Sequence, residues 1–172
     1  MIDKDMLKEY YYLYDMEEWK QARTILLRLL KIEPNNHWIL TSISSTLYEE
    51  RKYKQALKYS QKAYLLDEKC NLVLYDYANV LDMLGLELDA IKLWKSILNK
   101  GLFNIAKGHH GEGILKAKIM MNNCRFRIGS SYLDIGDKKN AKKYLILHLK
   151  NRNRGLPSII TKKEVVKLLD SI

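Results

Sequence analysis

Two adjacent histidines and a cysteine are the residues of this chain that most readily suggest chemistry. His109 and His110 lie in the segment GHHGEG, and Cys124 follows in the next predicted helix. Imidazole and thiolate groups are the ligands that structural zinc prefers. Adjacent histidine side chains point apart, however, and the neighbouring sequence offers no convincing fourth ligand. We therefore interpret these residues as structural and predict no metal site.

The same segment is glycine-rich and precedes a predicted helix, an arrangement that can bind phosphate. It follows a predicted helix instead of a strand, and it lacks the Lys-Ser/Thr pair of a P-loop. We expect Glu112 to favour the positive end of the next helix, or to pair with Arg125 or Arg152. No Ser-His-Asp or Cys-His arrangement is recognisable. The sequence therefore predicts neither an enzyme nor a cofactor.

The positive charge of the chain is concentrated in its last third. The net charge is +10, and residues 105–172 carry 15 basic and 5 acidic residues, whereas the charges of residues 1–104 cancel. Such a region indicates either an acidic partner or a solvated basic face. If the partner is a nucleic acid, Phe126 or Tyr132 would stack on bases. The phosphate contacts would then come from a basic patch of Arg125, Arg127, Lys142, Lys143, Arg152 and Arg154.

Composition restricts the class of protein. Hydrophobic residues make up 47% of the chain, which is enough for a core, while only 2 Pro and 8 Gly occur. We find no apolar run long enough for a membrane span and no secretory signal. Cys70 and Cys124 form no recognisable pattern, so we interpret both as small apolar packing groups. A cytoplasmic, mostly helical protein fits these features best.

The elements that would position these residues follow a fixed period. Ala22, Ala56 and Ala90 are spaced 34 residues apart. We expect each alanine to lie where two helices of one hairpin cross, because a larger side chain there would force the backbones apart. Large apolar residues align at two further positions of the frame: Met6, Leu40 and Leu74, and Leu13, Leu47 and Leu81. A period of this length indicates stacked helical hairpins.

This pattern resembles the tetratricopeptide repeat, a helix–turn–helix unit of 34 residues. Three units match without a gap, at about 3–36, 37–70 and 71–104. Ala141 lies 51 residues after Ala90, so 17 extra residues, an insertion at 105–121, precede a fourth unit at about 122–155. We expect KGHHGEG to form a loop before one long helix from about Gly113 to Ile135.

The remaining segment, 156–172, is predicted to cap the array. A capping box at Thr161 and Glu164 starts a short helix that ends near Ser171, with Val165, Val166, Leu168 and Leu169 covering the last apolar face. The resemblance therefore implies a single all-α domain over residues 1–172. Its fold would be a right-handed α-α superhelix, a solenoid of about four helical hairpins with an insertion before the fourth and a C-terminal capping helix.

A second resemblance concerns the C-terminal half. The run GEGILKAKIMMNNCRFRIGSSYLDIGD, followed by HLKNRNRGLPSI, is similar to a group of uncharacterised bacterial tetratricopeptide proteins. Those proteins share the Gly-Glu-Gly loop and the Cys-Arg-x-Arg segment. This resemblance supplies no activity.

In tetratricopeptide arrays the first helix of each hairpin lines a concave groove that binds peptides. In the 34-residue frame, the groove positions include Asp15, Ser45, Glu49 and Asp76. Aromatic side chains favour such a role, because they offer a large contact area at low entropic cost. The equally weighted alternative is that these rings pack on neighbouring helices. The predicted peptide-binding residues are Tyr11, Tyr14, Trp38, Tyr48, Tyr75, Asn79, Asn123, Phe126 and Arg127.

The leading prediction is thus a non-catalytic adaptor that binds a protein or peptide in its groove. Nucleic-acid binding through the basic C-terminal third is the alternative. Self-association is a third option, because an N-terminal unit with Met6, Leu7 and the cluster Tyr10–Tyr14 could stack on a second copy.

Overall fold

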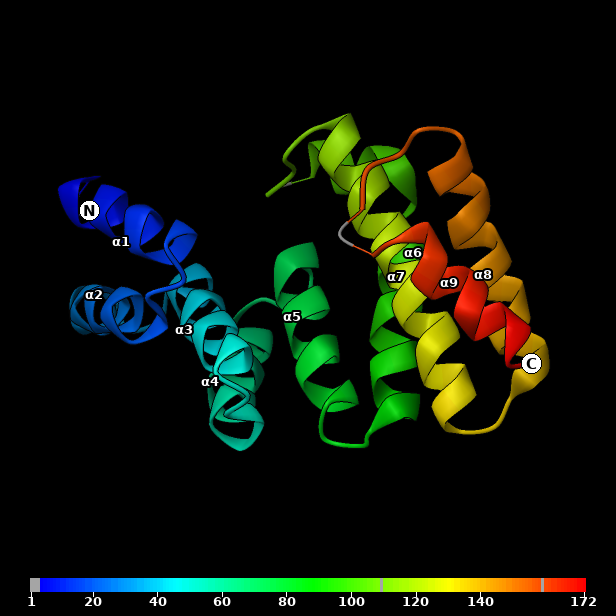
Figure 1. Cartoon of the computed structure of the whole chain (residues 1–172). Coiled ribbons are helices and arrows are strands. Elements are labelled where there is room, and N and C mark those ends of the chain that lie inside the picture. Colours follow the sequence, from blue (N-terminus) through cyan, green and yellow to red (C-terminus); the bar gives the residue numbers. More distant parts are fainter. Residues whose placement is uncertain (1–3, 109, 159) are drawn as a thin grey trace. The chain divides into compact units, whose positions relative to one another are not determined.

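A computed structural model describes residues 4–108, 110–158 and 160–172. Over these residues the chain forms nine α-helices and no strand (Figure 1). The all-α, helical-repeat fold predicted from the sequence is therefore confirmed. The helices are α1 (Lys4–Asp15), α2 (Trp19–Ile32), α3 (His37–Glu49), α4 (Tyr53–Leu66), α5 (Asn71–Asp82), α6 (Glu87–Lys107), α7 (Ile114–Asp134), α8 (Lys138–Asn153) and α9 (Lys162–Asp170).

The chain forms two compact units. Unit 1 spans Met1–Leu84 and contains α1 to α5, and unit 2 spans Gly85–Ile172 and contains α6 to α9. The boundary falls between α5 and α6, which are the two helices of the predicted third repeat. The grouping of all residues into one domain stays a prediction.

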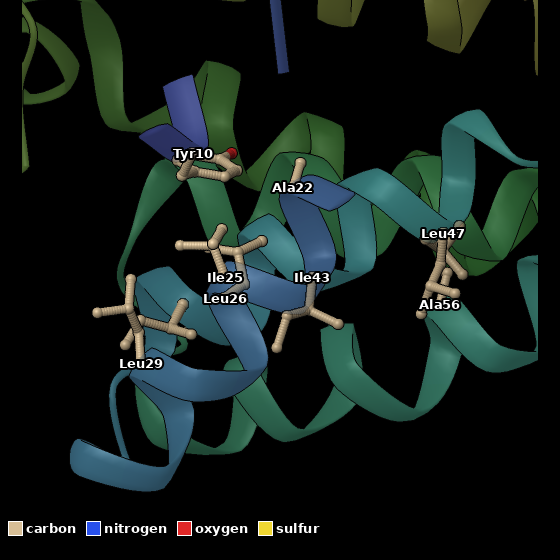
Figure 2. Close-up of a cluster of buried hydrophobic side chains, with 10 residues drawn as sticks. Tyr10, Ala22, Ile25, Leu26, Leu29, Ile43, Leu47 and Ala56 are labelled. Atoms are coloured by element: carbon tan, nitrogen blue, oxygen red, sulfur yellow. The ribbon is translucent and has the colours of Figure 1, made fainter. Parts of the chain in front are cut away.

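The core of unit 1 forms where the helices of each hairpin cross. Ala22 on α2 and Ala56 on α4 have no exposed surface, and Leu26 is equally buried beside them in the core. In Figure 2, Ala56 lies beside Leu47 of the neighbouring helix α3. A methyl group fills the space at such a crossing, and a larger side chain would separate the helices. The alanine period thus marks the helix contacts that the sequence predicted.

The turns between paired helices repeat with the same period as the alanines. Glu17, Arg51 and Gly85 all have positive φ angles of 58°, 59° and 77°. They are spaced 34 residues apart, and Gly136, with φ 79°, occupies the corresponding turn between α7 and α8. After α1, α3 and α7, the amide of the residue that follows the positive-φ residue donates to the carbonyl five residues earlier, at 2.9, 2.8 and 2.8 Å. This is the Schellman geometry that ends a helix in a left-handed residue.

In unit 2, α7 and α8 form the hairpin of the predicted fourth repeat. Gly129 on α7 is buried, and a Cβ atom at this position would lie 2.8 Å from Cγ of Leu145 on α8. Ala141 on α8 has no exposed surface. The close approach of the two helices therefore depends on small residues on both of them.

The residues of the predicted insertion, 105–121, are divided between two helices and a loop. α6 bends at Gly101, where φ is 77° and ψ is 161°, and continues to Lys107. α7 begins at Ile114, close to the start at Gly113 predicted for the long helix. Residues 108–113 connect the two helices, as the predicted loop does, and His109 lies outside the described residues.

The predicted first and last residues of the C-terminal capping helix are confirmed, because α9 has Thr161 as its N-cap and Ser171 as its C-cap. The hydroxyl of Thr161 accepts from the amide of Glu164 at 3.2 Å, and the Glu164 carboxylate accepts from the amide of Thr161 at 2.7 Å. This reciprocal pair defines a capping box. Val165 is fully buried in unit 2, whereas Val166 is exposed. The prediction that Val166 helps to cover the last apolar face is therefore wrong, because it points to the solvent side of α9.

We predict that Ala56→Leu lowers the free energy of unfolding by about 1–3 kcal/mol, because the added carbons overpack the crossing of α3 and α4. The matched control is Gln55→Leu at the neighbouring exposed position, where we expect a change within about 0.5 kcal/mol. Urea unfolding followed by circular dichroism measures both variants. Equal stability of the two leucine variants would contradict the assigned crossing.

The positive φ of Arg51 leads to a second prediction. Arg51→Gly should be more stable than Arg51→Ala by about 1 kcal/mol, because only glycine adopts the left-handed conformation without a steric cost. The side chain of Arg51 is exposed, so both variants remove a comparable surface group. Thermal unfolding of the pair tests the turn geometry, and a more stable alanine variant would show that this residue does not have a positive φ.

Candidate binding face on unit 1

Helices α1, α3 and α5 of unit 1 carry most of the predicted groove residues. The hydroxyl groups of Tyr14 on α1 and Ser45 on α3 lie 2.9 Å apart and form a hydrogen bond. The rings of Tyr10 and Tyr11 on α1 lie 5.7 and 6.3 Å from the ring of Trp38 on α3. The structure therefore brings the predicted residues Tyr11, Tyr14 and Trp38 together on one face.

These aromatic residues differ in their exposure. Tyr11 is 52% exposed, whereas Tyr14 and Trp38 are half-buried. Tyr10 is buried against Tyr11, Tyr14 and Trp38. Burial raises the pKa of its phenol to about 12. Tyr10 thus supports the face from below, and Tyr11 is the ring that solvent reaches most easily.

Three acidic residues act electrostatically on the phenol of Tyr14. Burial raises the pKa of Tyr14, and the negative charges of Glu49, Asp76 and Asp15 raise it further, while the hydrogen bond to Ser45 lowers it. The three carboxylates come from α3, α5 and α1 respectively. Their common effect on one phenol indicates that acidic residues from three helices lie near this face.

The carboxyl group of Asp76 on α5 has a raised pKa. Burial raises its pKa to about 7, and the neighbouring Ser44 hydroxyl acts in the opposite direction. Its Oδ2 atom is buried and has no hydrogen-bond partner among the described residues. A buried carboxylate without compensating donors favours its neutral form. The carboxyl group is therefore close to half-protonated at neutral pH.

The other predicted groove residues of unit 1 are less accessible than Tyr11. Tyr48 on α3 is half-buried, and its ring lies 5.4 Å from that of Tyr53 on α4. Tyr75 and Asn79 on α5 are also half-buried. Tyr48 thus packs on a neighbouring helix, which matches the structural alternative considered for these rings. The binding role of all three residues stays a prediction.

In unit 2, the predicted groove residues lie on α7. Asn123 accepts a hydrogen bond of 3.3 Å from the hydroxyl of Ser158, and the ring of Phe126 lies 5.5 Å from that of His148. Arg127 is half-buried. Two of these three side chains therefore contact other parts of unit 2, and their part in a groove stays a prediction.

A buried polar cluster that the sequence did not predict lies beside these residues. Asn122 on α7 and His148 on α8 have no exposed surface. His148 Nδ1 lies 2.9 Å from the carbonyl oxygen of Asn122, and the Asn151 amide donates to Asn122 Oδ1 at 2.9 Å. Burial lowers the pKa of His148. No sequence signal pairs these residues, because they come from two helices that only the folded hairpin joins.

The predicted basic patch is distributed over several elements of unit 2. Arg125 on α7 and Arg154 after α8 line an open pocket of about 530 Å³, together with Lys118, which the sequence analysis did not select. Arg152 donates to the carbonyl of Leu156 at 2.6 Å and so shapes the turn beside this pocket. Lys142 and Lys143 are exposed on α8. Nucleic-acid binding by these residues stays a prediction.

The residues first considered for metal chemistry have different surroundings. Cys124 is fully buried in α7, and burial raises the pKa of its thiol, which favours the neutral packing group. His110 is exposed, and His109 lies outside the described residues. The Glu112 carboxylate lies 3.8 Å from the ammonium group of Lys116. The expected pairing of Glu112 with Arg125 or Arg152 is therefore wrong, because the residue one helical turn further along is nearer.

Comparison with known proteins supports the fold. No family model matches the chain, and no curated protein matches it. The chain is similar to a solved structure described as the crystal structure of MamA, a protein with tetratricopeptide repeats. The TM-score is 0.60 with 15% identity over 99% of this chain and 92% of that chain. Among the described residues, no helix is long and apolar enough to cross a membrane. The chain has a tetratricopeptide-like helical fold.

The pKa of Asp76 leads to a prediction on pH dependence. Its folded pKa of about 7 lies above the unfolded value of about 3.9. Protonation of Asp76 therefore stabilises the fold below about pH 4, and this contribution is lost as the pH rises through 7. Asp76→Asn keeps the shape and removes the titration, so its stability relative to the natural chain should increase by about 1–3 kcal/mol between pH 5 and 8.

Urea unfolding at the two pH values measures this difference. Asp15→Asn is the matched control, because it neutralises an exposed carboxyl group on the same face. We expect this control to follow the natural chain. If the difference between the Asp76 variant and the natural chain were the same at pH 5 and 8, the buried carboxyl would not titrate as described.

Proposed function

We propose that the chain is a member of the tetratricopeptide family and a scaffold that binds a protein or peptide without catalysing a reaction. The alanine period, the left-handed turns at the same spacing and the similarity to MamA support the family. The repeat geometry places one helix of each hairpin on a common face, and such faces serve as binding surfaces.

The binding site of this proposal is the face of α1, α3 and α5. The observation that carries it is the exposed ring of Tyr11, which is held beside Tyr10 and Trp38. Asp15 and Glu49 act on the neighbouring phenol of Tyr14 and add negative charge near this face. Carboxylates attract a cationic group, and aromatic rings bind both apolar side chains and cations. The preferred ligand is therefore an extended segment that carries lysine or arginine beside an apolar residue.

Packing within the repeat does not explain why the ring of Tyr11 is exposed. Its ring lies 5.1 Å from that of Tyr10 and 6.3 Å from that of Trp38, so its position is set by neighbours while half of its surface stays in solvent. A ring held in place in this way loses little conformational entropy on binding. Such residues often contribute most of the affinity of an interface.

We predict that Tyr11→Ala weakens peptide binding by about tenfold or more. Tyr12→Ala is the matched control, because Tyr12 is 65% exposed on the same helix but lies outside the groove positions of the repeat frame. Peptides are selected from a displayed random library on the immobilised natural chain, and fluorescence polarisation measures their affinity for each variant. Tyr11 is the sharper probe than Tyr48 or Tyr75, since those two rings are half-buried.

The selected peptides also test the charge of the ligand. Replacing their lysine and arginine residues with glutamate should remove binding, and raised salt should weaken it. Equal losses for the Tyr11 and Tyr12 variants, or selected peptides without basic residues, would contradict the proposed face.

A further inference from the structure

Three potential metal ligands meet in unit 1, away from the aromatic face. His37 is the first residue of α3, Asp67 directly follows α4, and Cys70 directly precedes α5. Their ligand atoms lie within 4.8 Å of one another. The sequence did not predict this set, because Asp67 and Cys70 form only a short pattern and His37 lies 30 residues before Asp67, at the other end of the same repeat.

The spacing of the ligand atoms is close to the spacing that a tetrahedral zinc site requires. His37 Nε2 lies 3.9 Å from Asp67 Oδ2. Zinc bonds of 2.0–2.3 Å would place tetrahedral ligand atoms about 3.3–3.8 Å apart. The side chains therefore need to move by only about 1 Å to bind one ion. Cys70 is 5% exposed, and the side chains of His37 and Asp67 are 21% and 24% exposed, so the ligands are shielded but reachable from solvent.

The local backbone holds two of the ligands in place. The Oδ1 atom of Asp67 accepts from the amides of Lys69 and Cys70 at 3.0 Å each, which fixes the turn between α4 and α5. The other carboxylate oxygen is the one that faces His37. Hydrogen bonds of this kind orient ligating carboxylates in metal sites.

The type of residue at position 70 also points to a ligand. Cys70 is the N-cap of α5, and its side chain makes no capping hydrogen bond. Serine, threonine, aspartate and asparagine are preferred at N-caps because their oxygen atoms accept from the helix amides. Capping therefore does not explain a cysteine here. Cys70 packs in a buried cluster with Leu40, Ala63 and Val73, and coordination would give its thiol group a second role.

We infer that His37, Asp67 and Cys70 bind a divalent zinc ion. Imidazole, carboxylate and thiolate ligands together suit zinc, and the fourth position is left to water or another donor. The ion joins the first residue of α3 to the turn before α5 and so links the beginning and the end of the second repeat. This inference concerns a structural site and is independent of the proposed peptide binding.

Titration of the metal-free chain with cobalt(II), the spectroscopic substitute for zinc, tests the site. We expect a thiolate-to-cobalt absorption band that saturates at one ion per chain and disappears when zinc is added. Zinc should also raise the melting temperature, because the ion binds the folded state only. Cys70→Ala should abolish the band, whereas Cys124→Ala, which removes the other buried thiol, should keep it.

Asp67→Asn and His37→Gln provide a second test that preserves the approximate size of the side chains. The amide oxygen introduced by Asp67→Asn would still accept from the backbone amides of the turn, so the fold is retained while zinc affinity falls by about tenfold or more. Circular dichroism confirms folding of each variant. A chain without a saturable cobalt band, a band that survives in Cys70→Ala, or zinc affinity unchanged in both Asp67→Asn and His37→Gln would overturn the inference.

Discussion

The structure depends on the close crossing of paired helices at small residues. Ala22, Ala56, Ala90 and Ala141 have no exposed surface, and the methyl group is the largest side chain that lets the two backbones approach. Around each crossing, larger residues such as Leu26 and Trp94 fill the remaining volume. Close packing at these points has little tolerance for added volume, so the alanines determine the geometry of each hairpin.

Four turns of the same geometry join the paired helices. They lie after α1, α3 and α7 and at Gly85. The four left-handed residues keep the spacing of the alanines although their side chains are as different as Glu17, Arg51, Gly85 and Gly136. A charged residue in this conformation is strained by its Cβ atom. The hydrogen bonds of the turn and the packing of the following helix offset that strain, which explains why the backbone repeats where the sequence does not.

The same arrangement gives unit 1 two sites of different character. On one face, α1, α3 and α5 combine a supported aromatic cluster with the acidic residues Asp15 and Glu49, while burial favours the neutral form of Asp76. At the starts of α3 and α5, the repeat brings His37, Asp67 and Cys70 together. The first feature suits a cationic, partly apolar ligand, and the second suits a metal ion. Both arise because stacked hairpins bring equivalent helix positions together.

The sequence by itself determined the helical hairpins, their period, the long α7 and the capping box of α9, because these features depend on local spacing of small, apolar and capping residues. It also selected Tyr11, Tyr14 and Trp38. Only the tertiary structure decided which side chains remain accessible, since Tyr48 and Phe126 pack on partners from other helices. It also decided the raised pKa of Asp76 and the meeting of His37 with Cys70, because both depend on distances between helices that no local pattern encodes.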